Sequence, residues 1–474
     1  MKTALQMLAM AGASALVIGP CLAAEGRPPN FIVILMDDMG WRDVGFTGNT
    51  FVETPHLDRL AKDGIVFTQS YASAPNCAPT RACLMSGQYT PRHGIYTVVD
   101  PRQPPGAPWQ KLLAAESRSD LATEVVTIPE ALEPRGYASA FFGMWNLGRG
   151  RSGPCTPGGQ GFDTVVFPEN LGFGKDAYFD DQGNYLSDRL ADAVLEFVEC
   201  NRERPFFVYL ADHAVHAPLD PKRDLLAKYG KKKQSRGDGS DDPDYAATVE
   251  AVDQSVGRIM ATLDKLGLAD DTVVIFTSDN GGTRQYTAPL KGSKGELYEG
   301  GIRVPLVVAW PKIKRPGTTS DMPVASIDLY PTLLDLAGAP APAGQTLDGV
   351  SWAPVLRGDP PPTRQRLFWH FPCYVGKATP SSAVREGDFK LVEFFEDGGR
   401  AELYDLRRDP EERQNLAAAE PARTQALTTA LHAWQRETRA AVPDRENPAY
   451  DPAARRDMKG RGGQKREGRG GDRR

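Results

Sequence analysis

Short apolar runs rich in β-branched and aromatic residues recur along the chain, and amphipathic stretches separate them. Runs of this length and composition predict buried β-strands over residues 31–36, 138–143, 205–211, 272–278 and 304–310. Apolar positions at helical spacing, several followed by a glycine, predict helices over residues 54–64, 122–136, 187–201 and 245–267. Strands that alternate with helices predict an α/β domain with helices on both faces of its sheet.

A smaller second region follows the Pro/Ala-rich stretch 339–344, which we interpret as a linker. The pattern beyond it predicts short antiparallel strands and then a closing helix over residues 422–441. This pattern divides the mature chain into a large catalytic domain and a smaller α+β domain, at residues 27–340 and 345–445.

Charge is distributed unevenly along the chain, whose net charge is −5. Residues 455–474 hold nine Lys or Arg and three Asp or Glu, which gives this end +6 and leaves −11 for the rest. We predict that residues 446–474 form a disordered basic tail, because a Gly/Arg-rich sequence cannot bury a core. The acidic balance of the globular part gives no sign of nucleic-acid binding.

The first 24 residues have the pattern of a signal peptide. Lys2 precedes an apolar run, and small residues offer a cleavage site near Ala23 or Ala24. The run is short for a bilayer span, and no other stretch of about 20 apolar residues follows. We therefore expect a periplasmic or secreted protein without stable membrane insertion. Five cysteines remain after cleavage, so at least one lies outside any intramolecular disulfide.

Two polar pairs come directly after predicted strands. Asp37 and Asp38 follow the first strand, and Asp279 and Asn280 follow the strand at 272–278. Ligands bind beyond the carboxyl ends of parallel strands, so we expect the two pairs to converge if their strands are neighbours. Three carboxylates and an amide oxygen are suitable ligands for Ca²⁺ or Mg²⁺, and this ligand set does not distinguish the two ions. A solvated turn is the alternative interpretation of an Asp-Asp pair.

The segment SAPNCAPTRACLMSG, residues 73–87, places an arginine four residues after a cysteine. Pro79 suits the first turn of a helix, which puts Cys77 at a helix start that favours anions and Arg81 on the same face. Gly87 is expected to end this helix. One interpretation is a thiolate nucleophile with a depressed pKa. The alternative is a packed cysteine that happens to precede a helix.

The stretch CAPTRACLMSG resembles the signature of the formylglycine-dependent (type I) sulfatases, Cys-x-Pro-x-Arg followed by a Ser/Thr-Gly helix end. Other stretches resemble the same family in the family's order: VILMDDMGWRDVGFTGN, TPHLDRLAKDGIVFTQSYASAPNC, TPRHGIY, SDNGG, LKGSKGELYEGGIRVP and LYDLRRDPEERQNLA. The resemblance covers residues 28–417. It implies an arylsulfatase-like enzyme of the alkaline phosphatase superfamily, with a large mixed, mostly parallel sheet flanked by helices and a smaller C-terminal domain with an antiparallel sheet.

In that family a separate enzyme oxidises the cysteine to formylglycine. The resemblance therefore implies a formylglycine-generating or anaerobic sulfatase-maturating enzyme as a partner. One hydroxyl of the hydrated aldehyde attacks sulfur and releases the alcohol, and the second collapses to the aldehyde and expels sulfate. The family's metal ligands map onto this sequence, where they imply one Ca²⁺, with Mg²⁺ less favoured, held by Asp37, Asp38, Asp279, Asn280 and the modified Cys77.

The resemblance assigns further catalytic roles. Arg81 stabilises the hydrated aldehyde, Lys294 contacts sulfate, and His216 lies near the leaving-group oxygen. His216 or Lys294 could protonate the departing alcohol, and Asp279 could act as a base. Three other histidines are weighed as well: His213 and His93 are left open as functional or structural, and His370 is a candidate substrate contact from the smaller domain.

Residues 143–148, GMWNLG, depart from the family's Gly-Lys-Trp-His-Leu-Gly. Met144 replaces a lysine that contacts the hydrate and sulfate, and Asn146 replaces a histidine that hydrogen-bonds the nucleophile. Asn146 can still donate a hydrogen bond and stays a candidate catalytic residue. Two lost contacts of about 1.5–3 kcal/mol each would cost roughly 10²–10⁴ in rate, unless Arg149 or Arg151 supplies a compensating cation.

Three hypotheses follow for the function. The first is an active sulfatase that removes sulfate from a sulfated carbohydrate or an aryl sulfate. The second is a phosphate or phosphonate ester hydrolase of the same superfamily, acting on monoesters or diesters. The third is a degenerate homologue of low activity or a non-catalytic binding protein that has kept the fold. The intact Cys-x-Pro-x-Arg signature favours the first.

Overall fold

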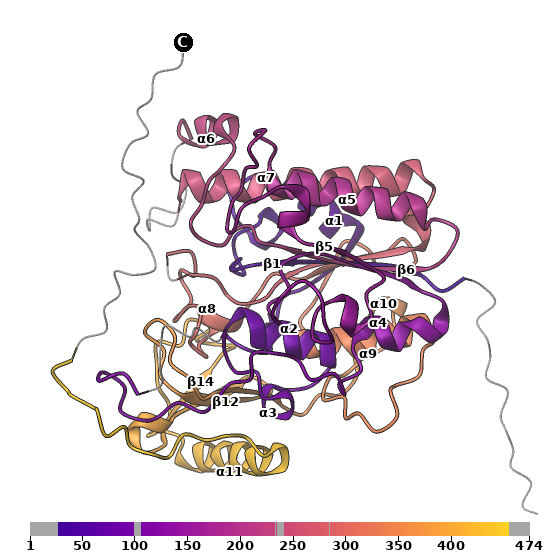
Figure 1. Cartoon of the computed structure of the whole chain (residues 1–474). Coiled ribbons are helices and arrows are strands. Elements are labelled where there is room, and N and C mark those ends of the chain that lie inside the picture. Colours follow the sequence, from indigo (N-terminus) through magenta and orange to yellow (C-terminus); the bar gives the residue numbers. More distant parts are fainter. Residues whose placement is uncertain (1–26, 99–105, 233, 235–240, 284, 455–474) are drawn as a thin grey trace, which may run out of the picture.

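The computed structural model describes residues 27–98, 106–232, 234, 241–283 and 285–454. The predicted signal peptide and residues 455–474 of the predicted tail lie outside this part of the chain. Figure 1 shows a central sheet between two layers of helices, with a second sheet below them that carries the helix α11 (Pro421–Thr438). Within the described residues, no helix combines the length and the apolar character needed to cross a membrane.

The central sheet has eight strands among the described residues, in the order β5-β4-β6-β1-β7-β8-β2-β9. The middle strands β4, β6, β1 and β7 are parallel neighbours, whereas β8 runs antiparallel to both β7 and β2. This mixed, mostly parallel sheet confirms the expected fold class. Its strands are β1 (Asn30–Met36), β2 (Gly64–Phe67), β4 (Ala138–Gly143), β5 (Thr164–Val166), β6 (Phe206–Asp212), β7 (Thr272–Ser278), β8 (Val307–Ala309) and β9 (Thr318–Ser320).

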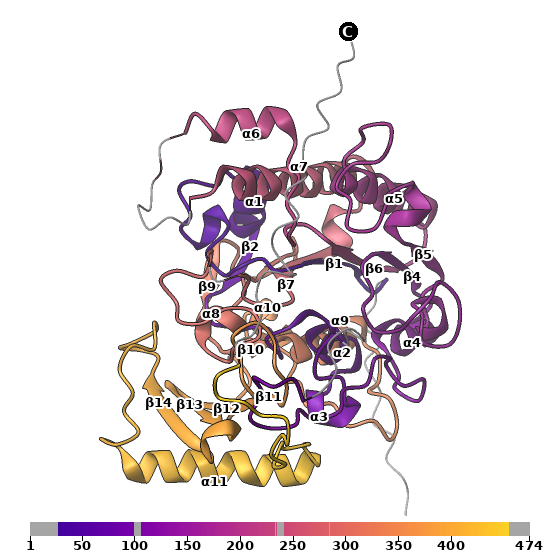
Figure 2. The same cartoon turned by 60° about the vertical axis from the view of Figure 1, so that its left-hand side comes forward.

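Helices cover both faces of this sheet, as Figures 1 and 2 show. Every residue of β1, β4, β6 and β7 is buried, and alternate side chains of β1, such as Ile32 and Val33, enter two separate apolar clusters. One face carries α1 (Pro55–Asp63), α5 (Leu186–Cys200), α6 (Arg223–Tyr229) and α7 (Pro243–Lys265). The other carries α2 (Cys77–Ser86), α4 (Ile128–Leu132), α9 (Leu329–Ala337) and α10 (Ala353–Arg357).

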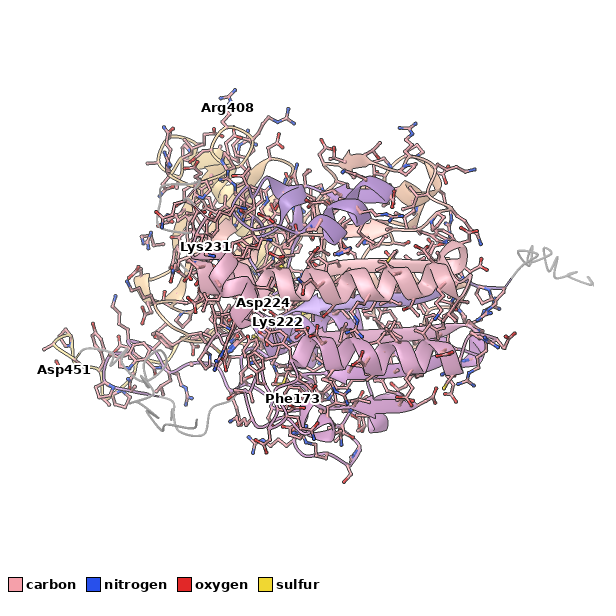
Figure 3. The ribbon with its side chains drawn as sticks, turned by 90° about the horizontal axis from the view of Figure 1, so that it is seen from above. Phe173, Lys222, Asp224, Lys231, Arg408 and Asp451 are labelled. Carbon is pink, nitrogen blue, oxygen red and sulfur yellow. The ribbon has the colours of Figure 1, made fainter. Side chains whose placement is uncertain are left out.

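The two long helices α5 and α7 lie side by side over the sheet (Figure 3). Lys222 joins them, because its Nζ donates to Asp188 Oδ1 of α5 at 3.0 Å and to Gln254 Oε1 of α7 at 3.4 Å. This layer packs on the face of the sheet opposite α2. Helix α2, on the other face, contains the predicted nucleophile segment.

The second sheet is antiparallel and has the order β11-β12-β13-β14, with α11 packed on the face away from the large domain (Figure 2). Its strands are β11 (Leu367–Phe371), β12 (Ser381–Glu386), β13 (Phe389–Phe394) and β14 (Arg400–Asp405). The short elements near it are β3 (Ser70–Tyr71), which pairs with β10 (Val324–Ala325), α3 (Thr90–His93) and α8 (Glu299–Ile302). Buried Lys390 lies 3.0 Å from both Glu299 and Glu412, and this charge network fixes the second sheet against the large domain.

The predicted helix at 122–136 is shorter in the structure. It is confined to α4 and a following 3₁₀ turn, Glu133–Arg135. Thr127 and Glu130 form a capping box that starts the helix, and Pro134 lies where the α-helix ends because it lacks the N–H that the helix requires. The predicted strand at 304–310 is likewise reduced to the three residues of β8.

The end of the described chain differs from the expected disordered tail. Asn447 is buried, and its Nδ2 donates to the carbonyls of Ala107 and Gln110 at 2.9 and 2.8 Å. Residues 446–454 are therefore tied to the 106–113 segment, because an asparagine amide satisfies loop carbonyls there. The prediction of disorder from residue 446 onward differs from the structure over these nine residues.

Candidate active site

The carboxyl ends of β1 and β7 bring the two polar pairs together. The strands are parallel with Met36 opposite Ser278, so Asp37 and Asp279 leave the sheet side by side. The N–H of Asp279 donates to the carbonyl of Met36 at 3.1 Å. Asp38 adopts a φ of 66°, in the left-handed region that aspartate tolerates. The expected convergence of these residues at one edge of the sheet therefore occurs.

Helix α2 brings Cys77 to the same edge. Asn76 caps the helix, because its Oδ1 accepts a hydrogen bond from the N–H of Cys77 at 2.8 Å, and Gly87 ends it with a φ of 68°. All residues of α2 are buried. Sequence reasoning missed Asn76, although the preference of asparagine for the N-cap position is a signal that could have found it.

Cys77 lies against the carboxylates that follow β1. Its Sγ is 3.2 Å from Asp37 Oδ1 and 3.8 Å from Asp38 Oδ1. One ligand atom from each of four buried residues lies within 4.8 Å of the others, a group made of Asp37, Asp38, Cys77 and Asp279. Carboxylates packed this closely repel one another, so the cluster needs positive charge.

Arg81 supplies part of this charge from the next turn of α2. Its Nε and Nη2 donate to the same oxygen of Asp279, Oδ2, at 3.0 and 2.7 Å, and Nη2 lies 3.3 Å from Asp37 Oδ2. The side chain is fully buried. The guanidinium also donates to the carbonyl of Met144, so Arg81 joins α2 to the ends of three strands.

Lys294 and Asn280 complete the inner contacts. Lys294 Nζ donates to Asp38 Oδ1 at 2.6 Å. The Nδ2 of Asn280 donates to Asp38 Oδ1 and Asp279 Oδ1, both at 2.7 Å, while its Oδ1 accepts from the N–H of Gly282 at 3.0 Å. The amide nitrogen therefore faces the carboxylates, because it is the half of the amide that can donate to them. The predicted role as an oxygen ligand requires the amide turned by half a turn.

Two histidines line the cluster beyond β6. His213 Nδ1 lies 3.8 Å from Asp37 Oδ2, and His216 Nε2 lies 3.7 Å from Asp38 Oδ2. Their rings are 4.9 Å apart. Tyr178 donates to the carbonyl of His216 at 2.7 Å and thereby supports the loop, a contact that sequence reasoning missed. His213 is nearly buried whereas His216 is about one-third exposed, so His216 is the more accessible of the two.

Comparison with known proteins identifies the family. The family model described as Sulfatase matches residues 29–339, about two thirds of the chain. The chain belongs to the sulfatase family. A second model, N-sulphoglucosamine sulphohydrolase, C-terminal, matches residues 293–440.

Individual relatives agree with this assignment. A protein named Sulfatase from Formosa agariphila is 32% identical over 502 residues, covering 88% of this chain and 90% of that protein. Arylsulfatase A of Homo sapiens is 32% identical over 468 residues, covering 85% and 87%. The crystal structure of Ps i-CgsB has a TM-score of 0.72 at 28% identity and covers 87% of this chain and 94% of that one; that protein has also been solved in complex with k-i-k-neocarrahexaose. This sulfatase is thus a sulfuric ester hydrolase with the alkaline-phosphatase-like fold.

The acid–base surroundings of Cys77 in this sulfatase do not favour a thiolate. Burial, followed by the charge of Asp279, raises the pKa of the Cys77 thiol well above its usual value. Burial also raises the pKa of Asp279 to about 7, with repulsion from Asp37 adding to the effect. These contacts do not support the interpretation of Cys77 as a depressed-pKa thiolate, because burial among carboxylates outweighs the effect of the helix start.

The other groups of the sulfatase site respond to the same charges. Burial acts to raise the pKa of Asp37, but Arg81 together with His213, His216 and Lys294 outweighs it and holds that pKa well below its usual value. Burial acts to lower the pKa of Lys294, but the acidic groups around it, Cys77 with Asp38, Asp37 and Asp279, together outweigh burial and raise that pKa well above its usual value. Both side chains are therefore charged at neutral pH.

The donor set of the sulfatase fits a hard divalent cation. Three buried carboxylates lie within reach of one another, and a cation placed among them offsets their repulsion, which Arg81 and Lys294 relieve in part. Carboxylate oxygens are the preferred ligands of Ca²⁺ and Mg²⁺. The sulfatase family generally uses formylglycine and a divalent metal, and the acidic cluster agrees with such an ion without identifying it.

The departure at residues 144 and 146 follows β4, and its backbone is joined to the cluster through Arg81. The backbone of Met144 is held on both sides, because its N–H donates to the carbonyl of Ala211 at 3.0 Å and its own carbonyl accepts from Arg81. Asn146 adopts a left-handed φ of 59°. Arg151 pairs with Glu169 and lies 4.1 Å from the centre of the Phe167 ring, so its expected role as a compensating cation is not what the structure shows. Arg149 is exposed.

Two of the histidines weighed from the sequence have structural environments. His370 is buried, with Nδ1 2.6 Å from Ser382 Oγ and Nε2 3.1 Å from the carbonyl of Ala441; the expectation of a substrate contact is wrong, because both ring nitrogens are occupied inside the second sheet. His93 is buried with Nε2 3.4 Å from Cys83 Sγ.

The five cysteines of the described residues are all free, and none forms a disulfide with another.

Proposed function

We propose that this sulfatase removes sulfate from a sulfated carbohydrate or an aryl sulfate, using formylglycine formed from Cys77 and a bound Ca²⁺. The single observation that carries the proposal is the position of Cys77 at the capped start of α2, 3.2 Å from Asp37 and within one compact group with Asp38 and Asp279. A neutral, buried thiol is a poor nucleophile, so this arrangement favours a modified residue at position 77.

The carboxylates Asp37, Asp38 and Asp279 would hold the ion, with Asn280 as the amide ligand. The ion supplies charge neutralisation for sulfate oxygens and lowers the pKa of a coordinated hydroxyl. Formylglycine supplies the oxygen nucleophile that the thiol lacks. We assign Ca²⁺ rather than Mg²⁺ on the family resemblance, since both ions accept this donor set.

The remaining side chains bind and orient the ester. Arg81 keeps residue 77 and the carboxylates in register through its two hydrogen bonds to Asp279. Lys294, held at Asp38, presents an ammonium group to the sulfate oxygens. His216, which is partly exposed and 3.7 Å from Asp38 Oδ2, is our candidate to give a proton to the departing alcohol oxygen, with Lys294 as the alternative. Asn146 contributes a neutral hydrogen bond where the family has an imidazole.

A carbohydrate sulfate is the leading substrate class. Among the relatives, Ps i-CgsB has been solved with a neocarrahexaose, and N-acetylgalactosamine-6-sulfatase of Mus musculus is 32% identical over 375 residues, covering 72% of this chain and 68% of that protein. Arylsulfatase A supports the aryl sulfate as a model substrate.

A phosphate or phosphonate ester hydrolase is the second candidate. It is favoured by one observation, the neutral residues Met144 and Asn146 in the segment after β4 whose Met144 carbonyl accepts a hydrogen bond from Arg81, because this segment carries a lysine and a histidine in the family pattern. Rates measured on matched sulfate and phosphate esters separate the two candidates, and a strong preference for phosphate would replace the first by the second.

We also propose that the chain is exported and matured before it acts. The signal-peptide pattern of residues 1–24 supports a periplasmic or secreted location, and Cys77 within Cys-x-Pro-x-Arg supports a formylglycine-generating or anaerobic sulfatase-maturating enzyme as partner.

Mass spectrometry of the peptide that contains Cys77, taken from protein made in its native host, tests the proposal directly. We expect an aldehyde at position 77 and loss of at least 10³ in kcat/KM for Cys77→Ala. Cys83→Ala, which removes a buried thiol of the same helix, is the matched control and should retain activity. An entirely unmodified Cys77 in active protein would refute the formylglycine mechanism.

A further inference from the structure

The charged network between the two sheets includes a short helix that also borders the candidate active site. Helix α8 lies between the central sheet and the second sheet in both views of the fold (Figures 1 and 2). Its first residue, Glu299, is buried and contacts Lys390 of β13 and Glu412, which follows β14. The helix therefore connects the smaller part of the fold to the segment that carries Lys294.

Glu412 contacts two partners through its two carboxylate oxygens. Oε2 accepts a hydrogen bond from the N–H of Glu299 at 2.7 Å, and Oε1 lies 3.0 Å from Lys390 Nζ. The side chain is fully buried. The N–H of Glu299 stands at the start of α8, where the helix itself offers no acceptor. Glu412 therefore satisfies a donor of the large domain from outside that domain.

The turn that presents Glu412 belongs to the stretch LYDLRRDPEERQNLA, residues 403–417. Asn415 closes this turn, because its Oδ1 accepts from the N–H groups of Leu403 and Ala417 at 3.0 and 2.9 Å. Glu412 itself adopts a φ of 55°, in the left-handed region that few residues other than glycine, asparagine and aspartate enter. A backbone held in a costly conformation is a reason to look for a function of the side chain that it places.

Glu299 is fixed at its side chain as well as at its backbone. Its Oε1 accepts a hydrogen bond from Lys390 Nζ at 3.0 Å, and its Oε2 accepts one from the hydroxyl of Tyr71 at 2.9 Å. Arg303, at the end of α8, lies 3.6 Å from the same Oε2. The start of α8 is thus held by charged and polar groups from several elements.

The other end of the connection is the backbone around Lys294. A Cβ at Gly301 of α8 would collide with the carbonyl oxygens of Ser293 and Glu296, the residues that flank Lys294 and Gly295. The N–H of Lys294 donates to the carbonyl of Gly282 at 2.8 Å. Because backbone lies directly on backbone here, a shift of α8 has to move the segment that carries Lys294.

The same helix touches the residue that follows Asn280. The N–H of Gly281 donates to the carbonyl of Gly301 at 3.0 Å, and a Cβ at Gly281 would collide with the carbonyl of Gly300. Helix α8 therefore contacts both the end of the polar pair after β7 and the Lys294 segment. Its position sets how these two parts of the site lie relative to each other.

We propose that Glu412 is a positioning residue for Lys294. It acts through Glu299 and α8, and so holds the ammonium group of Lys294 beside Asp38, where its Nζ donates at 2.6 Å. This inference rests on the proposed function, in which Lys294 contacts the sulfate oxygens. The smaller part of the fold then contributes to the reaction by fixing the sulfate-binding lysine, without touching the ester through Glu412.

Hydrogen exchange tests the link from Glu412 to α8 without relying on catalysis. Glu412→Gln must lose one contact, because an amide has a single acceptor oxygen, so peptides covering residues 291–302 should exchange several-fold faster. Peptides from β1 should not change. Glu393→Gln is the matched control, because Glu393 is a buried carboxylate of β13 that lies 2.7 Å from His432 of α11. Unchanged exchange over residues 291–302, or an equal change in both variants, would overturn the proposal.

A double-mutant cycle then tests whether the effect on activity acts through Lys294. Glu412→Gln should lower kcat/KM for a small aryl sulfate about 10-fold, since a displaced ammonium group binds the sulfate less well. In a Lys294→Met background the same change should have no further effect, because the two residues are coupled. Glu393→Gln should leave both rates unchanged. An equal loss with and without Lys294 would show a general structural role and contradict the positioning.

A second variant covers the case in which Glu412→Gln does not fold. Lys390→Met with Glu412→Gln removes both partners of the buried pair and leaves neither charge alone, which is the milder change. The same exchange and rate measurements apply to it, with the same outcomes. If the unaltered protein hydrolyses no sulfate ester, the proposed function fails, whereas hydrogen exchange still decides whether Glu412 holds the Lys294 segment.

Discussion

The guanidinium of Arg81 donates two hydrogen bonds to one carboxylate oxygen of Asp279, at 3.0 and 2.7 Å, across 198 positions of the chain. Both side chains are fully buried. This contact attaches the start of α2, and with it Cys77, to the end of β7. The nucleophile segment and the acidic cluster therefore form one rigid unit whose geometry depends on a buried charge pair.

Arg81→Met should lower the free energy of unfolding by about 3–5 kcal/mol, because it leaves Asp279 and Asp37 without their buried partner. Arg81→Lys should cost less stability but still reduce kcat/KM at least 10-fold, since an ammonium group cannot reproduce the guanidinium geometry. Urea unfolding and initial rates measure the two effects. Arg59→Met is the control, because the Arg59 side chain is 76% exposed in an ion pair with Asp63; a comparable loss there would remove the argument from burial.

Ca²⁺ should raise the melting temperature of the purified protein, and a chelator should lower it. An ion that binds only the folded state stabilises it by about 2.7 kcal/mol at a concentration 100 times its Kd. Asp38→Asn should abolish most of this response. Asp253→Asn, which changes a buried carboxylate of α7 that accepts a hydrogen bond from the N–H of Leu57 in α1, should keep it. A melting temperature that is the same with Ca²⁺, with the chelator and with neither would exclude a metal at the cluster.

Stability should fall in acid partly because of His370. Burial lowers the pKa of this imidazole from 6.5 to about 4, so between these values the unfolded chain binds a proton that the folded protein does not. The stabilising contribution is complete above pH 6.5 and decreases by roughly 3 kcal/mol as the pH falls to 4. His370→Gln should flatten the pH dependence of urea unfolding in this window. His56→Gln, at an exposed position, should leave it unchanged, and an identical slope in both variants would contradict the assignment.

The double variant Met144→Lys with Asn146→His should raise kcat/KM for a small sulfate ester by at least 10-fold. The change restores a cation and an imidazole beside a site whose backbone is already held by Arg81 and Ala211. One charge-assisted hydrogen bond contributes about 1.5–3 kcal/mol. Met144→Leu with Asn146→Gln is the matched neutral control. A fall in rate would mean that the pocket is adapted to neutral side chains and that another group already provides the charge.

The sequence predicted the elements whose formation depends on local pattern. Strands β1, β4, β6 and β7 are apolar along their whole length because both faces of a central parallel strand are buried. The start of α2 and its end at Gly87 were expected from Pro79 and the glycine itself, whereas the cap at Asn76 was missed. The convergence of Asp37 and Asp279 could be expected because parallel neighbours end at one edge. The roles of the site residues stay predictions until the variants are measured.

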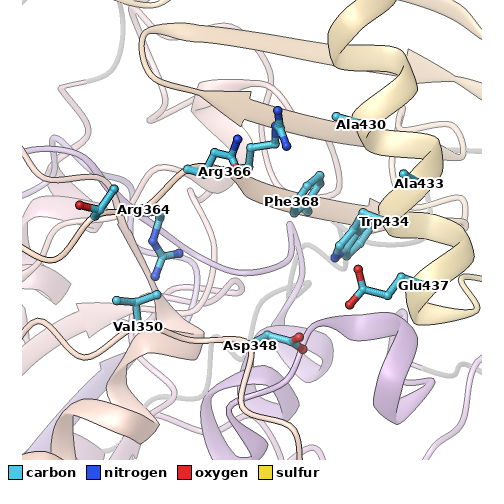
Figure 4. Close-up of a pocket in the computed structure, with 11 residues that line it drawn as sticks. Asp348, Val350, Arg364, Arg366, Phe368, Ala430, Ala433, Trp434 and Glu437 are labelled. Carbon is cyan, nitrogen blue, oxygen red and sulfur yellow. The ribbon is translucent and has the colours of Figure 1, made fainter.

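Tertiary structure decided the features that depend on residues distant in the chain. The pKa of the Cys77 thiol is raised rather than lowered because carboxylates from two strands surround it, and no local motif encodes that burial. His370 is enclosed because strand β12 and the residues after α11 meet its two nitrogens. A pocket of about 380 Å³ lined by Trp434 (Figure 4) exists because α11 packs beside β11 and the 348–350 segment. Sequence alone thus determined which segments form strands and helices, whereas charge state and enclosure were set by the folded contacts, because both depend on distances between side chains that only the packed chain fixes.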